Sequence, residues 1–396
     1  MLKKINPTII TLVLLWVGHF LVDFMIGIWA IFKTLEGLDI GKAGLIAGIS
    51  AFAGEGLQAY FGSLSDRGHT KKLILIGMIA TTCAAFLPYG NSYEIYFLLF
   101  LLTCLGSGAF HPCAAGLIGK LSPARKGLFI TLFASGGCAG IAVSQIVFRS
   151  AYASLGAQVG LIALPTLFLV LFILLNTIPD WNHRPAPSTK QRFVSEIFHF
   201  FKRRELTYLY ILQVCSQSVF WGMIFLLPDI LHTRQAPTWF AFGGGHLFYT
   251  LGMGLLLAPA GYLADRFSAR QVLNTVFVIG TISLFTFLCF PTLPIHFQAL
   301  VLFIFGGAIG AVNPVGVAYG THLVPDKPGM ISAFLMGMVW CVAEVIGPAG
   351  GGMLTRLFTT DAPAYAMGIL GLLLLIGFAM SVLLPQEKKE LKLGVA

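Results

Sequence analysis

Gly62-Ser-Leu-Ser-Asp66-Arg67 is matched 199 residues later in this chain by a similar stretch, Gly261-Tyr-Leu-Ala-Asp265-Arg266. A second match follows in the same order, because Gly108-Ala-Phe-His111-Pro112 returns 202 residues later as Gly310-Ala-Val-Asn313-Pro314. Short matches in the same order and at a near-constant offset are not expected by chance. They indicate that the chain is built from two copies of one structural unit.

The composition places both copies in a lipid bilayer. Apolar residues make up 57% of the 396 residues and charged residues only 10%, whereas roughly a quarter of an average soluble protein is charged. A soluble protein with so few charges would have too little polar surface to cover its core. The net charge of +9 is therefore interpreted as a signal for membrane orientation rather than for nucleic-acid binding.

Apolar runs define the expected helices. A bilayer core of ~30 Å requires about 20 apolar residues per helix, and Pro, Gly and charged residues divide the chain into twelve such runs. We therefore predict an all-α polytopic membrane protein with twelve transmembrane helices, arranged in two six-helix bundles related by pseudo-twofold symmetry. The runs cover residues 8–35, 41–64, 73–90, 94–120, 127–150, 157–179, 206–233, 239–263, 270–290, 294–321, 328–357 and 363–384.

The two bundles are expected over residues 1–179 and 206–396, with a linker over residues 180–205 between them. Within the linker, apolar side chains recur at helical spacing and are followed by basic residues, namely Phe193, Val194, Ile197, Phe198 and Phe201 before Lys202, Arg203 and Arg204. This pattern predicts a short amphipathic helix that lies on an anionic membrane surface. Binding of a soluble partner is the alternative.

The distribution of Lys and Arg predicts the orientation, since cytoplasmic loops carry an excess of both. With the amino terminus in the cytoplasm, twenty of the 25 Lys and Arg residues fall on the cytoplasmic side. The five on the opposite side are Lys33, Lys42, Arg149, Arg234 and Arg356. We expect a multi-pass protein of a cell inner (cytoplasmic) membrane with both termini in the cytoplasm.

With these motifs in place, the whole chain resembles the major facilitator superfamily. Gly62-x-Leu-x-Asp66-Arg67, followed by Lys71 and Lys72, is similar to the signature loop between helices two and three of that superfamily. The resemblance implies alternating access, in which two halves move about a central site, and this agrees with the internal duplication. It also implies a cytoplasmic gate formed by Gly62, Asp66, Arg67, Gly261, Asp265 and Arg266.

Residues 1–150 resemble the fosmidomycin-resistance branch of drug exporters more narrowly. His19-Phe-Leu-Val-Asp23, Phe110-His111-Pro112 and Gly136-Gly137-x-x-Gly140 carry this resemblance. The chain departs from the branch at Cys113, where an acid is expected. It also departs at Ser144-Gln145, where the antiporter motif of helix five ends in Gly-Pro.

Three acidic residues, Asp23, Glu55 and Glu344, stand near the middle of their apolar runs, and Asp229 lies at the margin of its run. Acids inside a bilayer are costly and usually functional. No Lys or Arg is expected at a comparable depth, so these carboxyl groups require protons or a histidine partner. The resemblance implies that helices two and eleven pack at the bundle interface, so Glu55 and Glu344 are expected to approach each other there.

His19 and Asp23 are four residues apart, which places them on one face of a helix. An imidazole beside a carboxylate can hold a shared proton near neutral pH. Asp23, His19, Glu344 and Glu55 are therefore the expected proton-coupling residues, and a structural polar pair is the alternative for the first two. A metal site would require further ligands, and His111 and His246 are expected at different depths, so neither a metal nor a cofactor is predicted.

The resemblance implies that helices one, four, seven and ten line a cavity. The His111-Pro112 and Asn313-Pro314 pairs can each present a polar group to it, because proline bends a helix. A polar stripe on helix seven adds amides and an indole, with ordinary packing as its alternative. The predicted cavity residues are His111, Gln213, Gln217, Trp221, Asn313 and His246. Acids without a base favour a neutral, zwitterionic or cationic molecule over an anion.

The sequence thus predicts a secondary active transporter that exports a small organic molecule by proton antiport. Proton-coupled uptake (symport) of a small organic solute or metal chelate is the alternative, because Ser144-Gln145 interrupts the antiporter motif. The expected partners are a small-molecule substrate, protons and the lipid bilayer, without nucleic acid, and the expected state is a monomer. An enzyme is not expected, because the chain shows no Ser/His/Asp set, HExxH motif or phosphate loop.

Overall fold

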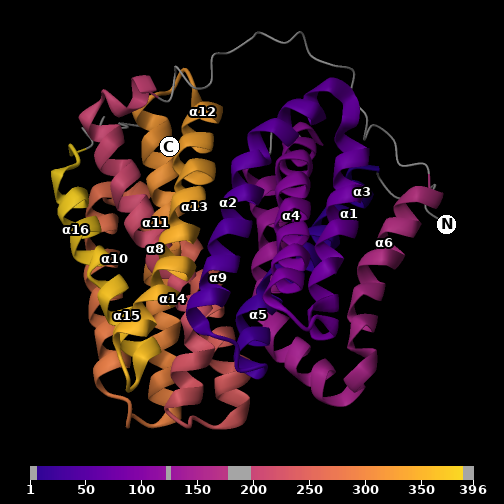
Figure 1. Ribbon diagram of the computed structural model, residues 1–396. Coiled ribbons are helices and arrows are strands. Elements are labelled where there is room, and N and C mark those ends of the chain that lie inside the picture. Colours follow the sequence, from indigo (N-terminus) through magenta and orange to yellow (C-terminus); the bar gives the residue numbers. More distant parts are fainter. Residues whose placement is uncertain (1–6, 122–125, 177–197, 387–396) are drawn as a thin grey trace.

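The computed structural model describes residues 7–121, 126–176 and 198–386, which fold almost entirely into helices (Figure 1). Ten helical stretches of the described residues are long and apolar enough to cross a membrane. Two of these, Ile40–Tyr89 with 50 residues and Leu128–Leu175 with 48 residues, are far longer than the ~20 residues that one crossing requires. Each covers two of the predicted runs, so the prediction of twelve crossings is confirmed.

The first half contains six crossings that alternate in direction (Figure 1). They are α1 (Pro7–Leu35); α2 (Ile40–Leu64); η2 (Ser65–His69), α3 (Thr70–Thr81) and η3 (Thr82–Tyr89) together; α4 (Tyr93–Leu121); α5 (Lys126–Leu155); and η5 (Gly156–Ala163) with α6 (Leu164–Leu175). The chain reverses direction between α2 and α3 and between α5 and α6. Gly68 (φ 93°) and Gly156 (φ 51°) take the left-handed conformation at these two reversals, and glycine adopts that conformation without steric cost.

The second half repeats this order. Its crossings are α8 (Arg204–Thr233); η6 (Phe240–Gly244) with α9 (Gly245–Arg266); α10 (Ala269–Cys289); α11 (Ile295–Leu323); the short segments α12 (Pro328–Ser332), η7 (Ala333–Gly337), α13 (Met338–Glu344), η8 (Val345–Gly350), α14 (Gly351–Leu354) and η9 (Thr355–Leu357) together; and α15 (Ala362–Gly371) with α16 (Leu373–Leu383). The eleventh crossing is the least regular of these, and Pro348 lies inside it.

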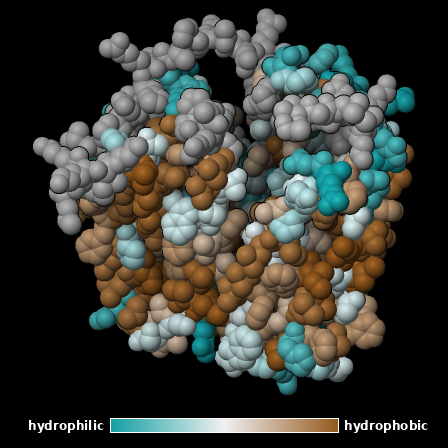
Figure 2. Space-filling model, turned by 180° about the vertical axis from the view of Figure 1, so that it is seen from behind, coloured by the Kyte–Doolittle hydropathy of each residue, from teal (hydrophilic) through white to brown (hydrophobic). Residues whose placement is uncertain are grey.

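The two halves stand side by side, and we call their ends in Figure 1 the upper end, where α1 begins and α16 ends, and the lower end, where α1 meets α2. The turns that follow α2 and α9 both lie at the upper end, as predicted for Asp66 and Asp265. Figure 2 shows a belt of apolar side chains between the two ends and a hollow between the halves toward the upper end. The belt is the surface expected to face lipid.

Glycines bring the halves together at the lower end. A Cβ atom built on Gly44 of α2 would lie 2.4 Å from the carbonyl oxygen of Pro348, and one built on Gly352 of α14 would lie 2.6 Å from the carbonyl oxygen of Ile40. Any larger residue at either position would push the two backbones apart. The halves are therefore closed against each other at the lower end and separated toward the upper end.

The predicted amphipathic linker helix lies only in part within the described residues, which exclude Phe193, Val194 and Ile197. Residues 198–201 are helical. Phe198 is exposed, whereas the ring of Phe201 lies 5.0 Å from the ring of Phe334 in η7. This part of the linker therefore packs on the second half, and its contact with a membrane surface stays a prediction.

Candidate functional site

The glycine motif of α5 brings its backbone against α1. A Cβ atom built on Gly136 or on Gly140 would lie 2.6 Å or 2.1 Å from a backbone carbonyl oxygen of α1. Gly137, between them, faces the side chains of His19 and Asp23, and a Cβ atom there would lie 2.3 Å from a polar atom of each. The motif therefore leaves the space that the His19–Asp23 pair occupies.

A second histidine completes this cluster. Nε2 of His19 lies 3.3 Å from Oδ2 of Asp23, and Nε2 of His111 in α4 lies 3.2 Å from Oδ1 of Asp23. The two Nε2 atoms are 3.1 Å apart. The side chain of His19 is 9% exposed, and those of Asp23 and His111 are 21% and 22% exposed. We call these three residues the His–Asp–His cluster.

The depth expected for His111 is thus wrong, because α4 runs antiparallel to α1 and carries His111 to the level of His19. His246, which was also expected at a different depth from the His19–Asp23 pair, does lie apart from the cluster. Its Nε2 lies 2.7 Å from the carbonyl oxygen of Ile141 in α5, and its side chain is buried. His246 therefore joins the two halves through α9 and α5.

The other ring nitrogen of each cluster histidine faces a backbone carbonyl oxygen. Nδ1 of His19 lies 2.9 Å from the oxygen of Phe133, and Nδ1 of His111 lies 2.9 Å from the oxygen of Ser107. A carbonyl oxygen only accepts, so both Nδ1 atoms carry hydrogen and donate to it, and the Ser107 hydroxyl oxygen, 3.1 Å from Nδ1 of His111, can accept the same hydrogen. This fixes the tautomer of a neutral ring, with the Nε2 lone pair directed at the other members of the cluster.

Glu55 of α2 and Glu344 of α13 lie at the interface of the halves. The two carboxyl groups interact electrostatically with each other and with Asp23. A Cβ atom built on Gly48, in the same helix as Glu55, would lie 3.3 Å from the carbonyl oxygen of Glu344, so the helices meet here. In the described part of the chain, neither acid forms a salt bridge with Lys or Arg.

Two of the predicted cavity residues of the second half, Gln213 and Asn313, form hydrogen bonds with each other. The Gln213 amide donates to the carbonyl oxygen of Asn313 at 3.0 Å, and the Asn313 amide donates to the carbonyl oxygen of Leu335 at 3.2 Å. These contacts connect α8, α11 and η7. Gln217 is buried, and Nε1 of Trp221 is buried without a hydrogen-bond partner among the described residues.

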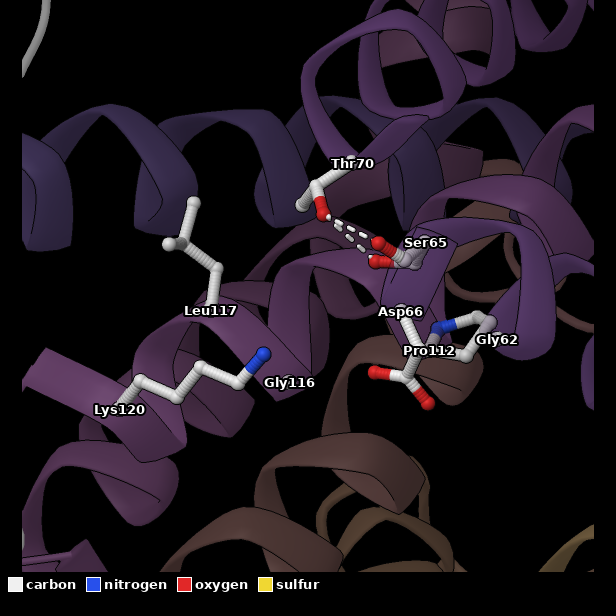
Figure 3. A pocket seen from close by; sticks show the side chains of 8 residues that line it. All are labelled: Gly62, Ser65, Asp66, Thr70, Pro112, Gly116, Leu117 and Lys120. Carbon is white, nitrogen blue, oxygen red and sulfur yellow. Dashed lines mark hydrogen bonds between the residues drawn. The ribbon is translucent and has the colours of Figure 1, made fainter. Parts of the chain in front are cut away.

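The signature loop lines a cavity of about 210 Å³ at the upper end of the first half (Figure 3). Figure 3 shows the Asp66 carboxylate and the Lys120 ammonium group on different sides of it. The cavity is lined by Gly62, Ser65, Asp66, Thr70, Pro112, Gly116, Leu117 and Lys120. A Cβ atom on Gly62 would make an ordinary 3.7 Å contact with Pro112, and one on Gly261 would meet open space.

The four charged residues of the predicted gate, Asp66, Arg67, Asp265 and Arg266, form no ion pair with one another; all four belong to the described part of the chain. The separation of the halves at this end explains why no pair forms between their two signature loops. Their role as a gate stays a prediction.

Two ion pairs that join the halves at the lower end were not predicted. Lys33 of α1 pairs with Asp229 of α8, and their side chains are 0% and 8% exposed. Thr34 also donates to Asp229, at 2.7 Å. Asp39 and Arg356 form a second pair at 2.9 Å, with side chains 44% and 45% exposed. Both pairs connect the first half to the second.

Lys33 is thus a buried base, although it lies in the last turn of α1 and not near the middle of that helix, where Asp23 lies. A sequence shows only that Lys33 follows an apolar run. Its burial depends on Asp229, which comes from the other half and lies 196 residues away.

Comparison with known proteins agrees with this architecture. The Major Facilitator Superfamily model matches residues 9–245 and 238–395. Multidrug resistance protein MdtH of Photorhabdus laumondii is 24% identical over 366 residues, which cover 88% of this chain and 86% of the relative. MdtH of Yersinia enterocolitica is 25% identical over 358 residues, which cover 84% of each chain. The uncharacterized MFS-type transporter YfkF of Bacillus subtilis is 28% identical over a segment that spans only 28% of its length.

Solved structures show the same fold. A bacterial homolog of the human lysosomal transporter Spinster, in an inward-facing and unoccupied conformation, superposes with a TM-score of 0.79 at 14% identity over 96% of this chain and 98% of its own. The nucleoside transporter NupG gives a TM-score of 0.78 at 15% identity over 95% and 99%. The family match extends over nearly the whole sequence. The chain belongs to the Major Facilitator Superfamily, as a multi-pass membrane transporter.

Proposed function

We propose that this transporter is a proton-coupled antiporter that exports a small neutral, zwitterionic or cationic organic molecule across a bacterial inner membrane. The excess of Lys and Arg in the loops of the upper end supports a cytoplasmic location for that end. The relatives named as multidrug resistance proteins support export. In this orientation the hollow between the halves opens toward the cytoplasm.

The electrostatic interaction between Glu55 and Glu344, which belong to helices that meet at the interface of the halves, supports the proposal. One acid belongs to each half, and the described residues supply neither with a Lys or Arg partner. Ionising both would place two negative charges together at low dielectric, which is costly. Separating the halves, or admitting water, lowers that cost. Proton binding at this pair is therefore linked to the relative position of the halves, which is the requirement for coupling.

The charge distribution supports a cargo that is not an anion. Asp23, Glu55 and Glu344 supply negative charge to the interior, and they interact with one another. The buried base Lys33 is already neutralised by Asp229. Since none of the salt bridges between described residues gives these three carboxylates a Lys or Arg partner, an anionic cargo would meet repulsion beside them.

The proposal is tested in two steps. A thermal-shift screen on the purified protein identifies a ligand, because binding to the folded state raises its melting temperature. Transport of that ligand is then measured in proteoliposomes under an imposed pH gradient. Antiport predicts that protons moving in one direction drive accumulation in the other, whereas movement of both in the same direction would favour symport.

Glu55→Gln and Glu344→Gln are the informative variants. Each removes a proton-binding group while keeping its size, so each is expected to change the pH dependence of transport and to retain folding. Glu94→Gln is the matched control, because Glu94 is exposed at the start of α4. If both interface variants keep the wild-type pH profile, the pair is structural and the coupling proposal is wrong.

A further inference from the structure

We infer that the His–Asp–His cluster is a binding site for a divalent transition-metal ion. This inference goes beyond the proposed function and does not depend on proton coupling or on the direction of transport, because it concerns binding at equilibrium. It begins from a conflict within the cluster. Two imidazole nitrogens and the two oxygens of the Asp23 carboxylate face one another at 3.1–3.3 Å, and acceptors without a cation between them repel one another.

The tautomers make this conflict unavoidable. Both Nδ1 atoms are committed as donors to carbonyl oxygens, so a neutral His19 and a neutral His111 present only lone pairs to each other and to the Asp23 carboxylate. A positive charge must therefore sit among the three groups, either as protons on the rings or as a bound cation. Histidines that ligate a metal commonly donate their other N–H to a backbone carbonyl, as both rings do here.

The spacing fits a metal ion. At a metal–ligand distance of 2.0–2.1 Å, the edges of a tetrahedron of ligands measure about 3.3–3.4 Å. The Nε2–Nε2 separation of 3.1 Å is close to these values, and so are the separations of 3.3 Å from His19 Nε2 to Oδ2 of Asp23 and of 3.2 Å from His111 Nε2 to Oδ1 of Asp23. Three protein ligands leave a fourth position open for water or for a donor atom of a cargo. The partial exposure of Asp23 and His111 gives an ion access to the cluster.

The residues around the His–Asp–His cluster also favour a preformed binding site. The ring of Phe133 stacks on that of His19 with 4.2 Å between centroids, which provides an apolar wall and holds the imidazole plane. Gly137 leaves open the side of the cluster that faces α5, because a Cβ atom there would lie 2.3 Å from both Asp23 Oδ2 and His19 Nε2. A larger residue at position 137 would displace the ligand atoms.

The donor set selects the class of metal. Two imidazoles and one carboxylate suit Zn²⁺, Co²⁺ and Ni²⁺, whereas Mg²⁺ and Ca²⁺ prefer shells of oxygen alone. A divalent cation also agrees with the preference for cationic cargo derived from the buried acids. The organic partner of such an ion would be a chelator that supplies the remaining ligands.

Co²⁺ is the probe, since its visible absorption distinguishes a tetrahedral site from a hydrated octahedral ion. The purified full-length protein is titrated with Co²⁺ alone, without a pH gradient, and Zn²⁺ and Mg²⁺ are then added as competitors. We expect one tetrahedral Co²⁺ per chain, displaced by Zn²⁺ and not by Mg²⁺. Octahedral absorption, or displacement by Mg²⁺, would overturn the inference.

Asp23→Asn and His111→Ala test the ligands. Loss of a supporting contact already lowers metal affinity roughly 10–100-fold, so loss of a ligand is expected to lower it by about a hundredfold or more. His296→Ala is the control, because His296 is exposed at the start of α11, and it should bind Co²⁺ as the wild type does. Because Asp23→Asn keeps the size of the side chain, this variant is expected to fold even if His111→Ala does not.

A third variant, Gly137→Ala, keeps all three ligand residues but displaces the ligand atoms of His19 and Asp23, and it too should weaken binding. Wild-type affinity in both Asp23→Asn and Gly137→Ala would show that the cluster holds protons only. The Co²⁺ titration measures no transport, so absence of metal binding would not contradict the coupling proposal. Likewise, a negative result in the transport assay would not contradict metal binding.

Discussion

The buried pair between Lys33 and Asp229 predicts a large effect of one substitution on the closure of the lower end. Lys33→Met leaves the Asp229 carboxylate in the interface with only the Thr34 hydroxyl as a described partner. The side chains are 0% and 8% exposed, so water offers little compensation. The pair joins the halves where they touch, and the variant should therefore favour arrangements in which the lower end opens.

The magnitude follows from burial. Removing one partner of a buried ion pair costs about 3–5 kcal/mol, and because each ~1.4 kcal/mol is a factor of ten, closure weakens by roughly a hundredfold to several thousandfold. The Asp39–Arg356 pair joins the same halves, but its side chains are 44% and 45% exposed. A pair of that kind contributes about 0–1 kcal/mol, so Arg356→Gln is a matched control with at most a small effect.

Distances between spin labels at Ala153 and Thr359 measure closure, because both residues are exposed at the lower end of opposite halves. Lys33→Met should broaden the distance distribution and shift it to longer values, and Arg356→Gln should leave it near that of the wild type. The double variant Lys33→Met with Asp229→Leu replaces the pair by apolar groups and should restore much of the closed population. If Lys33→Met and Arg356→Gln gave equal distance distributions, the buried pair would not be the dominant contact between the halves at the lower end.

Three further outcomes are expected. Gly140→Ala should lower the melting temperature, because the added methyl group would lie 2.1 Å from a carbonyl oxygen of α1, whereas Gly56→Ala meets open space and is the control; equal losses would contradict this packing. Gln145→Leu should raise the melting temperature, since both polar atoms of Gln145 are buried without a described hydrogen-bond partner and such a group costs about 1–3 kcal/mol; a lower melting temperature would indicate that a ligand or water satisfies the amide. The backbone N–H in the first turn of α2, together with Arg356, holds the pKa of Asp39 below its ordinary value. Its stabilising contribution is therefore complete above that ordinary value of ~3.9 and is lost as the pH falls through the lowered pKa, so the melting temperature of the wild type should fall over this pH range more than that of Asp39→Asn.

The crossings were predictable because a bilayer imposes a strict requirement on length. An apolar run of about 20 residues has few alternatives to a transmembrane helix, so even the interrupted eleventh crossing appears where expected, over residues 328–357. The His19–Asp23 contact was also predictable, since residues four apart share a helix face. Both inferences use only local sequence.

The contacts that were missed depend on how helices sit against one another. His111 joins the cluster because α4 is placed so that its histidine reaches the depth of His19, and nothing within α4 specifies that depth. Lys33 is buried because Asp229 meets it across the halves. The signal that could have indicated the second contact is the matching position of the two residues, each near the end of the first crossing of its half.

The duplication relates the His–Asp–His cluster of the first half to a neutral contact in the second half. His111 in α4 corresponds to Asn313 in α11, and His19 contacts His111 as Gln213 contacts Asn313. Both halves thus keep a polar contact between their first and fourth crossings. In the second half the amides donate to each other and to backbone oxygens and need no charge, whereas in the first half acceptor atoms converge and require a positive charge, as protons or as a bound cation. The same pair of crossings is therefore held together by a charged cluster in the first half, where we propose the cation site, and by a neutral contact in the second half.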